Sequence, residues 1–242
     1  MPTPVSASAL AAFKKVSTAT LTTLLFKRGL RNTFLQGVRL LGAGPGQMVG
    51  PAYTLRYIPA REDLDHLGVF LDHGHPQRVA VEQIPPGHVL VMDSRGDASA
   101  ASAGSILVTR MMVRGVAGVV TDGGLRDSHE IARLAIPSYC QAPSAPTNLI
   151  KHHAVDLNVP IGCGGVPVYP GDIIVGDAEG VVVVPHEIAE AVAAEATGQT
   201  LFEDFVTEQV LAGRGIFGLY PPTDPATGEQ FKAWCAAKGV KP

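Results

Sequence analysis

The chain has 242 residues, of which 46% are hydrophobic and 17% are charged. This length and composition exclude a disordered chain and predict a globular protein with a sizeable buried core, in one large or two small domains. The formal net charge is −3, with both signs mixed along the chain and no basic tract, so we expect no nucleic-acid partner.

The first third of the chain predicts one helix and two strands. Residues 17–30 place three leucines on one helical face, with Ser17 or Thr18 as the N-cap and a glycine as the stop. Residues 48–57 alternate in polarity and contain aromatic and β-branched side chains, and residues 88–93 form a short apolar run after a turn. Both segments are predicted to be strands.

The middle of the chain predicts a helix at residues 104–115, capped by Ser105 and ended by Gly115, and then a buried strand at residues 116–122. The remaining predicted elements are a helix at 128–134, strands at 137–140, 155–159, 166–169, 172–176 and 180–184, and helical segments at 185–195 and 202–212. This order predicts an α/β fold with a mixed sheet, in a single domain over residues 1–213. Residues 214–242 form a Pro/Gly-rich tail expected to pack on the domain or on a neighbouring subunit.

The most informative feature is a polar cluster, residues 122–127, that directly follows the buried strand. Open α/β sheets bind ligands at the carboxyl ends of their strands. The start of the preceding helix should lie nearby, and its N–H groups at Ile106 and Leu107 would then form an anion site. Arg126 is suited to grip a carboxylate with two hydrogen bonds, and Asp127 offers a hard oxygen ligand for Mg²⁺. Together these groups predict a site for a 2-oxo acid.

A structural explanation of the same residues stands beside the functional one. Arg126 and Asp127 could form a salt bridge within a turn, and Asp122 could cap a neighbouring segment. The GGxRD sequence is too short to decide between the two interpretations from physical arguments alone.

The stretch nevertheless resembles the family that contains the regulator of ribonuclease activity A and the 4-hydroxy-4-methyl-2-oxoglutarate (4-carboxy-4-hydroxy-2-oxoadipate) aldolases. The family pattern RGxxGxVxDGxxRD matches residues 114–127. Further matches in the C-terminal half are Asn158-Val-Pro160, Gly164-Gly165, Pro170-Gly171-Asp172, Gly176-Asp177 and Gly180-Val181. The resemblance covers roughly residues 15 to 213.

The resemblance implies a swivelling β/β/α-type sandwich that assembles as a homotrimer or hexamer. It also implies a metal-dependent pyruvate aldolase, a carbon–carbon lyase with oxaloacetate decarboxylase side activity, using Mg²⁺ or alternatively Mn²⁺. By this match Arg126 would bind the pyruvate unit and Asp127 the metal. The helix start at Gly104, Ser105, Ile106 and Leu107 would hold the substrate carboxylate, and Glu203 would reach the site of a neighbouring subunit.

Ser105 is a departure from the family pattern. The pattern begins with an acid that stands twenty residues before the Arg-Asp pair, and residues 106 to 125 are those twenty here. That acid helps to orient metal-bound water, whereas serine brings no charge. The departure leaves open a different class of function, a non-catalytic regulator that binds and inhibits ribonuclease E.

Three other clusters carry weaker functional signals. Residues 93–97 form a polar group at a strand end that could face the same cleft, although a turn is the favoured interpretation. The adjacent His152 and His153 are expected to be structural rather than metal ligands, and residues 162–165 are expected to form a tight loop rather than a phosphate cradle.

The cysteines and the apolar pattern bear on location. Cys140, Cys163 and Cys235 lie far apart without CxxC spacing, so we expect no disulfide and a reducing cytoplasm. No run of about 18 apolar residues predicts a membrane helix, and residues 1–13 lack the pattern of a signal peptide. We expect a soluble cytoplasmic protein without a membrane partner.

Overall fold

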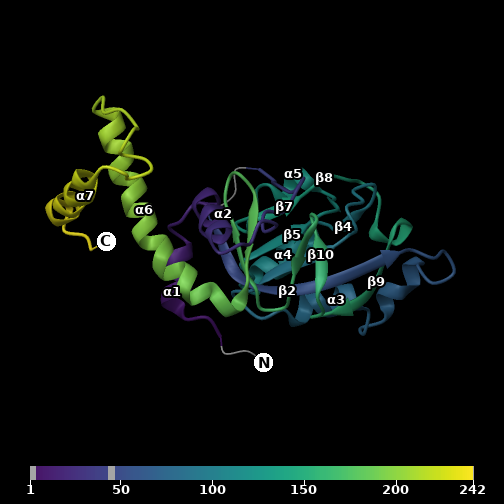
Figure 1. Ribbon diagram of the computed structural model, residues 1–242. Helices are drawn as coiled ribbons and strands as arrows, with labels where there is room; N and C mark the ends of the chain where they lie inside the picture. Colours follow the sequence, from purple (N-terminus) through teal and green to yellow (C-terminus); the bar gives the residue numbers. More distant parts are fainter. Residues whose placement is uncertain (1–3, 43–46, 242) are drawn as a thin grey trace.

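A computed structural model describes residues 4–42 and 47–241 (Figure 1). Residues 1–3, part of the 1–13 segment predicted not to be a signal peptide, lie outside the described residues. The helices are α1 (Ala7–Phe13), α2 (Thr18–Lys27), α3 (Pro76–Gln83), α4 (Ser105–Val113), α5 (Ser128–Ile131), α6 (Ala189–Leu211) and α7 (Pro225–Lys238). The strands are β1 (Arg39–Leu40), β2 (Met48–Pro59), β3 (Val89–Asp93), β4 (Ala101–Ala103), β5 (Gly118–Thr121), β6 (Gly124–Leu125), β7 (Ser138–Cys140), β8 (Ala142–Pro143), β9 (His152–Leu157), β10 (Ile161–Cys163), β11 (Val166–Val168), β12 (Ile173–Gly176) and β13 (Val181–Val184). Short 3₁₀ turns lie at Leu67–Leu71, Asn148–Ile150 and His186–Ile188.

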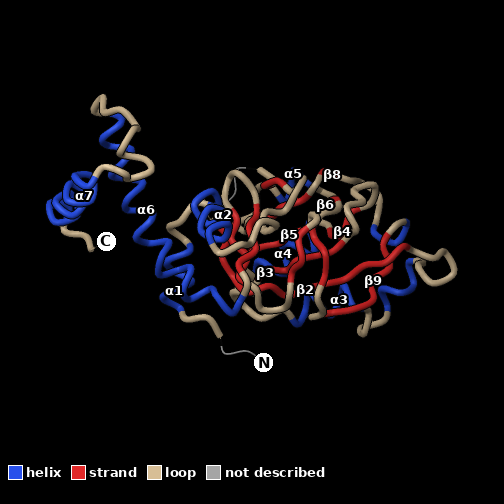
Figure 2. Tube along the Cα trace, in the orientation of Figure 1, coloured by secondary structure: helices blue, strands red, loops and turns tan. Residues whose placement is uncertain are grey.

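An eight-stranded mixed sheet forms the centre of the molecule. Strands β2, β3, β5 and β7 run parallel, whereas β1, β9, β12 and β13 pair antiparallel to their neighbours. Strand β2 is long enough to pair with β12 through Met48–Pro51 and with β9 through Leu55–Pro59 (Figure 2). The predicted fold class, a mixed α/β single domain of the swivelling β/β/α type, is confirmed.

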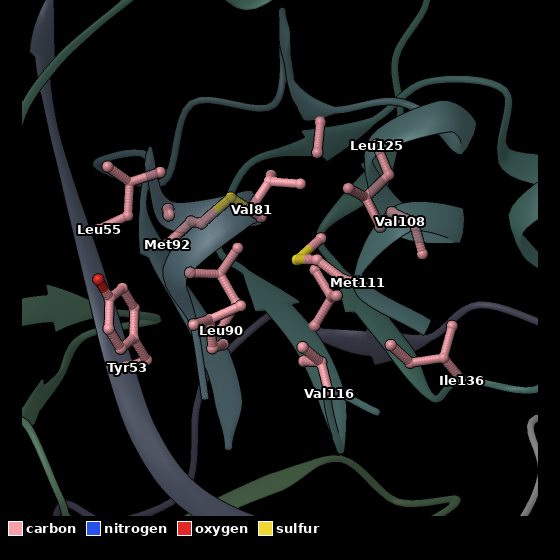
Figure 3. Close-up of a cluster of buried hydrophobic side chains, with 14 of the residues drawn as sticks. Tyr53, Leu55, Val81, Leu90, Met92, Val108, Met111, Val116, Leu125 and Ile136 are labelled. Atoms are coloured by element: carbon pink, nitrogen blue, oxygen red, sulfur yellow. The ribbon is translucent and has the colours of Figure 1, made fainter. Parts of the chain in front are cut away.

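Helices α3 and α4 cover one face of the parallel strands. Val108 and Met111 of α4 point into a cluster with Leu90 and Met92 of β3 (Figure 3). Because Leu125 belongs to the same cluster, the helix and the chain that follows β5 are held together by a common core. A second cluster packs α1, α2 and the first half of α6 against β12 and β13.

The second half of α6 leaves the body, and α7 packs across its far end (Figure 1). Four aromatic side chains hold the two helices together: Phe202, Phe205, Phe231 and Trp234. Apolar side chains near the end of this arm remain exposed, and Phe217 is 97% exposed. Within residues 4–42 and 47–241, no helix is both long enough and apolar enough to cross a membrane.

Most predicted elements are confirmed, but two expectations about helices were wrong. The segments predicted at 185–195 and 202–212 are one continuous helix, α6, because Ala193 and Ala196 pack on the core and carry it through the Gly198 region. Ser105 does not cap α4; Gly104 is the N-cap residue, and Ser105 is the first helical residue. The tail contains an unpredicted helix, α7.

Candidate active site

The polar cluster after β5 is positioned by a small parallel sheet of β4, β6 and β8. Its register places Ala103, the last residue of β4, beside Leu125, the last residue of β6. The Arg126 N–H donates to the Ala103 carbonyl oxygen at 3.1 Å. Two carboxyl strand ends therefore meet, and the start of α4 lies against residues 126 and 127.

Asp127 is held by the first residue of α4. Its Oδ2 accepts hydrogen bonds from the Ser105 N–H at 3.2 Å and the Ser105 hydroxyl at 3.3 Å. Gly104 allows this close approach, because a Cβ there would lie 2.8 Å from Arg126 Cγ and 2.9 Å from Asp127 Oδ2. The Asp127 backbone adopts φ +54°, a left-handed conformation that Asp and Asn tolerate better than other side chains. Ser105 thus positions the carboxylate.

Arg126 and Asp127 line a cavity of about 410 Å³, here called the Arg126 cavity. Its other lining residues are Leu67, Phe70, Gln77, Arg78, Ala101, Ala103, Gly104, Ile106, Leu107, Thr147 and Asn148. A volume of this size suits a small metabolite. The structure therefore brings the predicted residues Gly104, Ile106, Leu107, Arg126 and Asp127 to one cavity, with Ser105 directly behind Asp127.

The Arg126–Asp127 pair is loose. Arg126 Nε lies 3.7 Å from Asp127 Oδ2, and the side chains are 45% and 36% exposed. A partly exposed pair at this distance contributes little to folding stability. The turn salt bridge considered from the sequence is present, and it leaves both groups able to contact a ligand.

The start of α4 offers less than predicted. The Leu107 N–H donates to the Gly104 carbonyl oxygen at 3.1 Å, and the Ser105 N–H is used by Asp127. The Ile106 N–H lies between them in the first turn, where helical N–H groups lack an acceptor inside the helix. Of the two N–H groups predicted to bind an anion, that of Leu107 therefore already has an acceptor in the helix, and the anion-binding role itself stays a prediction.

The Asp122 carboxylate stabilises the fold and does not line the Arg126 cavity. Its carboxylate accepts from the backbone N–H groups of Ser94 at 2.7 Å, Gly96 at 3.0 Å and Gly164 at 3.2 Å. Burial raises the pKa of the Asp122 carboxyl, and the hydrogen bonds from Ser94 and Gly164 act in the opposite direction. This carboxylate ties its own segment after β5 to the two loops that supply these N–H groups.

The other clusters singled out from the sequence also serve the fold. Arg95 and Gly96 of the 93–97 group line a separate depression beside Asp122, so this group does not face the Arg126 cavity. His152 Nδ1 lies 3.0 Å from an Arg95 nitrogen, whereas His153 Nδ1 lies 2.8 Å from Asp65 Oδ1. The adjacent histidines therefore have separate partners.

The loop at residues 162–165 is a hairpin turn between β10 and β11, with positive φ at both central glycines. All three cysteines are buried and free. Burial raises the pKa of the Cys140 thiol to about 11, which disfavours the reactive thiolate.

Glu203 is not brought to the Arg126 cavity of its own chain. It lies on α6, where its carboxylate accepts from the Thr20 hydroxyl at 2.6 Å and from Gln199 Nε2 at 2.9 Å. The Thr20 contact fastens α6 to α2, whereas Gln199 lies on α6 itself. A role for Glu203 in catalysis requires a second copy of the chain.

A metal ion in the Arg126 cavity would rest mainly on Asp127. No other carboxylate lines this cavity, and the described residues contain no group of three or more His, Cys, Asp or Glu side chains able to hold a metal. A single hard oxygen ligand fits Mg²⁺, which keeps several waters and is commonly completed by substrate oxygens. It does not fit Zn²⁺, which needs three or four protein ligands.

Sequence reasoning missed the part of the cavity that comes from other elements. Phe70, Gln77 and Arg78 come from the 3₁₀ turn at Leu67–Leu71 and from α3, and Asn148 comes from the 3₁₀ turn after β8. No motif marks these residues, and they lie far from the Arg-Asp pair in sequence.

Comparison with known proteins gives consistent matches. The family described as RraA-like, Aldolase/RraA, matches residues 18–183. A Halalkalibacterium halodurans protein named "Putative 4-hydroxy-4-methyl-2-oxoglutarate aldolase" is 38% identical over 139 residues, 57% of this chain and 60% of that protein. A Burkholderia mallei protein of the same name is 34% identical over 147 residues, 61% of this chain and 81% of that protein.

A solved structure extends the match to most of the fold. Streptomyces coelicolor RraAS2, described as an unusual member of the RNase ES inhibitor RraA protein family, superposes with a TM-score of 0.74 at 30% identity. The superposition covers 85% of this chain and 98% of that one.

Proposed function

This chain belongs to the RraA-like Aldolase/RraA family, and on that basis we propose that it is a metal-dependent lyase acting on 4-hydroxy-2-oxo acids. The proposed reaction cleaves the substrate to pyruvate and a second carbonyl compound, with oxaloacetate decarboxylation as a side activity. The observation that carries the proposal is the pairing of Arg126 and Asp127 on a small cavity at the start of α4.

The proposed ion is Mg²⁺, with Mn²⁺ as the alternative, held by the Asp127 carboxylate. When bound, the ion would act as a Lewis acid toward the 2-oxo acid group. Ser105 would keep the carboxylate in place through its N–H and hydroxyl.

Arg126 would stabilise the charge that develops in the reaction. A water molecule in the site would accept the C4 hydroxyl proton. The C3–C4 bond then breaks as the C4 carbonyl forms, and the bond's electron pair passes to the pyruvate fragment as an enolate. A guanidinium placed where this charge appears lowers the barrier, and the Ile106 N–H would bind the substrate carboxylate. The same water would then return the proton to C3 of the enolate, which gives pyruvate. No lysine lines the cavity, which favours this route over a Schiff base.

We also propose that the active assembly is a homotrimer or hexamer in which Glu203 of one copy approaches the Arg126 cavity of another. Support comes from the arm formed by α6 and α7, which leaves Leu211, Ile216 and Phe217 exposed. Burying these side chains against another copy would remove apolar surface from water. Light scattering at micromolar concentration tests the assembly, and a monomer would contradict it.

The test of the proposed reaction is pyruvate release from a panel of 4-hydroxy-2-oxo acids, with Mg²⁺ and with EDTA. We expect turnover with the metal and its loss in the chelator. Full turnover in EDTA, or an adduct with pyruvate trapped by borohydride, would refute the metal-dependent mechanism.

The second candidate function is inhibition of ribonuclease E by binding. It is supported by the similarity to RraAS2, which is described as a member of the RNase ES inhibitor RraA protein family. An assay of ribonuclease E activity with added protein separates the two functions. Inhibition that survives the Arg126→Ala substitution, together with no pyruvate release by the unmodified protein, would favour the regulator.

A further inference from the structure

The Arg126 cavity contains a second guanidinium that the proposed reaction does not use. Arg78 lies on α3 and lines the cavity, and its Cζ lies 4.2 Å from the centroid of the Phe70 ring. None of the ion pairs within residues 4–42 and 47–241 includes Arg78. Burial lowers the pKa of Arg78, as expected for a partly desolvated cation without an anionic partner.

An unused hydrogen-bond donor lies in the same cavity. Asn148 is 4% exposed, and its Nδ2 is buried with no hydrogen-bond partner, whereas its Oδ1 accepts from the Thr147 hydroxyl at 3.3 Å. Gln77 is different, because its amide nitrogen donates to the Ser102 carbonyl oxygen at 2.7 Å. The Gln77 amide nitrogen already has a partner within the fold, whereas the Asn148 Nδ2 has none among the described residues.

These two observations point to an anion. A buried polar group without a partner costs folding free energy, so a ligand that satisfies it binds with a corresponding gain. The Phe70 ring restrains the plane of the Arg78 guanidinium, and a restrained planar fork matches a carboxylate with two parallel hydrogen bonds. Arg78 and Arg126 together outnumber Asp127, so the lining of the cavity carries a net positive charge.

We propose that Arg78 and Asn148 form a second carboxylate subsite, which selects 2-oxo acids that carry a carboxylate at the end remote from the pyruvate unit. This inference rests on the proposed function, since it assumes that Arg126 and the start of α4 hold the pyruvate end. The second carboxylate stays with the carbonyl product when the C3–C4 bond breaks. Arg78 and Asn148 thus determine specificity and take no part in bond cleavage.

The test compares two substrates in the full-length protein, 4-hydroxy-4-methyl-2-oxoglutarate and the monocarboxylate 4-hydroxy-2-oxopentanoate. The Arg78→Met variant should lower the ratio of their kcat/KM values, dicarboxylate over monocarboxylate, by about tenfold or more, mainly through KM. Arg78→Lys should recover part of the ratio, because it keeps the charge but not the fork. Asn148→Asp should also lower the ratio, since it adds a negative charge where the second carboxylate binds.

Arg110→Met is the matched control, because Arg110 is paired with Glu82 outside the cavity, 2.8 Å from its carboxylate. It should leave the ratio unchanged. An unchanged ratio in Arg78→Met, or an equal loss for both substrates, would overturn the subsite.

A binding measurement separates this inference from the proposed function. In calorimetry with Mg²⁺ present, 2-oxoglutarate should bind the unmodified protein more tightly than pyruvate does, and Arg78→Met should reduce that advantage about tenfold. If no substrate releases pyruvate but the advantage is lost in Arg78→Met, the lyase fails and the subsite holds. If the unmodified protein does not prefer 2-oxoglutarate, or if Arg78→Met keeps the preference, the subsite is refuted.

Discussion

Asp122 and Asp127 belong to the same motif, five positions apart, but their environments differ in every respect that matters for function. Asp122 is 5% exposed and accepts from three backbone N–H groups of two loops. Asp127 is partly exposed, accepts only from Ser105 within the described residues, and faces the Arg126 cavity. The Asp122 carboxylate accepts three hydrogen bonds through both of its oxygens, whereas both hydrogen bonds to Asp127 come from one residue and go to a single oxygen, Oδ2.

The difference shows that the two acids of this motif have different roles: Asp122 stabilises loops, and Asp127 is available to a ligand. A carboxylate surrounded by N–H donors stabilises the loops that supply them and has no capacity left for a ligand. A carboxylate held from one side only is oriented but remains available to a cation. The two acids should therefore respond oppositely to substitution, one losing stability and the other losing activity.

The largest expected effect is on activity and lies at Arg126, which lines the Arg126 cavity together with Asp127. Arg126→Ala should lower kcat/KM for pyruvate formation. The drop should correspond to a loss of about 3 kcal/mol or more of transition-state stabilisation, because the developing enolate charge loses its guanidinium. Arg133→Ala is the control, since it removes the same charge from an exposed position outside the cavity. A folded Arg126→Ala variant with near-native kcat/KM would place the reaction elsewhere.

The next largest effect is on folding stability and lies at Asp122. Asp122→Asn should lower the free energy of unfolding by about 3 kcal/mol, because an amide nitrogen would face N–H donors that now meet a carboxylate oxygen. Asp127→Asn should cost less than about 1 kcal/mol, since the side chain is partly exposed and Asn tolerates the same backbone conformation. Urea unfolding measures both variants. Equal losses would remove the distinction between the two acids.

A smaller effect, on metal dependence, is expected from Ser105→Asp, which would place a second carboxylate beside Asp127. The Ser105 hydroxyl lies 3.3 Å from Asp127 Oδ2, so the two charges would repel each other until a cation binds. The Mg²⁺ concentration for half-maximal oxaloacetate decarboxylation should fall several-fold and the rate should rise. Ser105→Asn controls for size. Unchanged metal dependence with an unchanged or lower rate would mean that an acid at position 105 does not assist metal binding in this protein.

The smallest effect is a pH dependence of stability. Burial raises the pKa of Asp122 above its ordinary value of 3.8, so the folded state holds this proton more tightly than the unfolded chain does. The resulting stabilisation is complete below the unfolded pKa and is lost as the pH rises through the folded pKa. The stability deficit of Asp122→Asn should therefore be larger near about pH 4 than near about pH 7. A deficit that is constant or grows with pH would show that the folded pKa is not raised.

Much of the fold could be predicted because apolar periodicity is a local signal. Helix α2 begins after Ser17, whose hydroxyl caps it as expected, and β2, β3, β5, β12 and β13 are apolar runs bounded by turn residues. Strands β4, β6 and β8 contain only two or three residues each and have too few side chains to show a period. Their pairing with one another, which is not local, defines them.

Part of the candidate site could likewise be predicted from a local sequence pattern, and part could not. The motif indicated Arg126, Asp127 and the start of α4, because they are joined by one strand and one helix. Arg78 and Asn148 could not be predicted, because only tertiary packing brings α3 and a distant 3₁₀ turn to this cavity. The roles of Asp127 in metal binding and of Glu203 between subunits remain predictions.

The central claim is that Asp127, and not Asp122, holds the metal ion on which the proposed reaction depends. Titration with Mn²⁺, followed by electron paramagnetic resonance at a temperature where all variants are folded, tests it directly. We expect the unmodified protein to have a Mn²⁺ site from which Mg²⁺ displaces the ion. Asp122→Asn should retain this site, and Asp127→Asn should weaken Mn²⁺ binding by about tenfold or more. Unaltered Mn²⁺ binding by Asp127→Asn would show that Asp127 does not hold the ion.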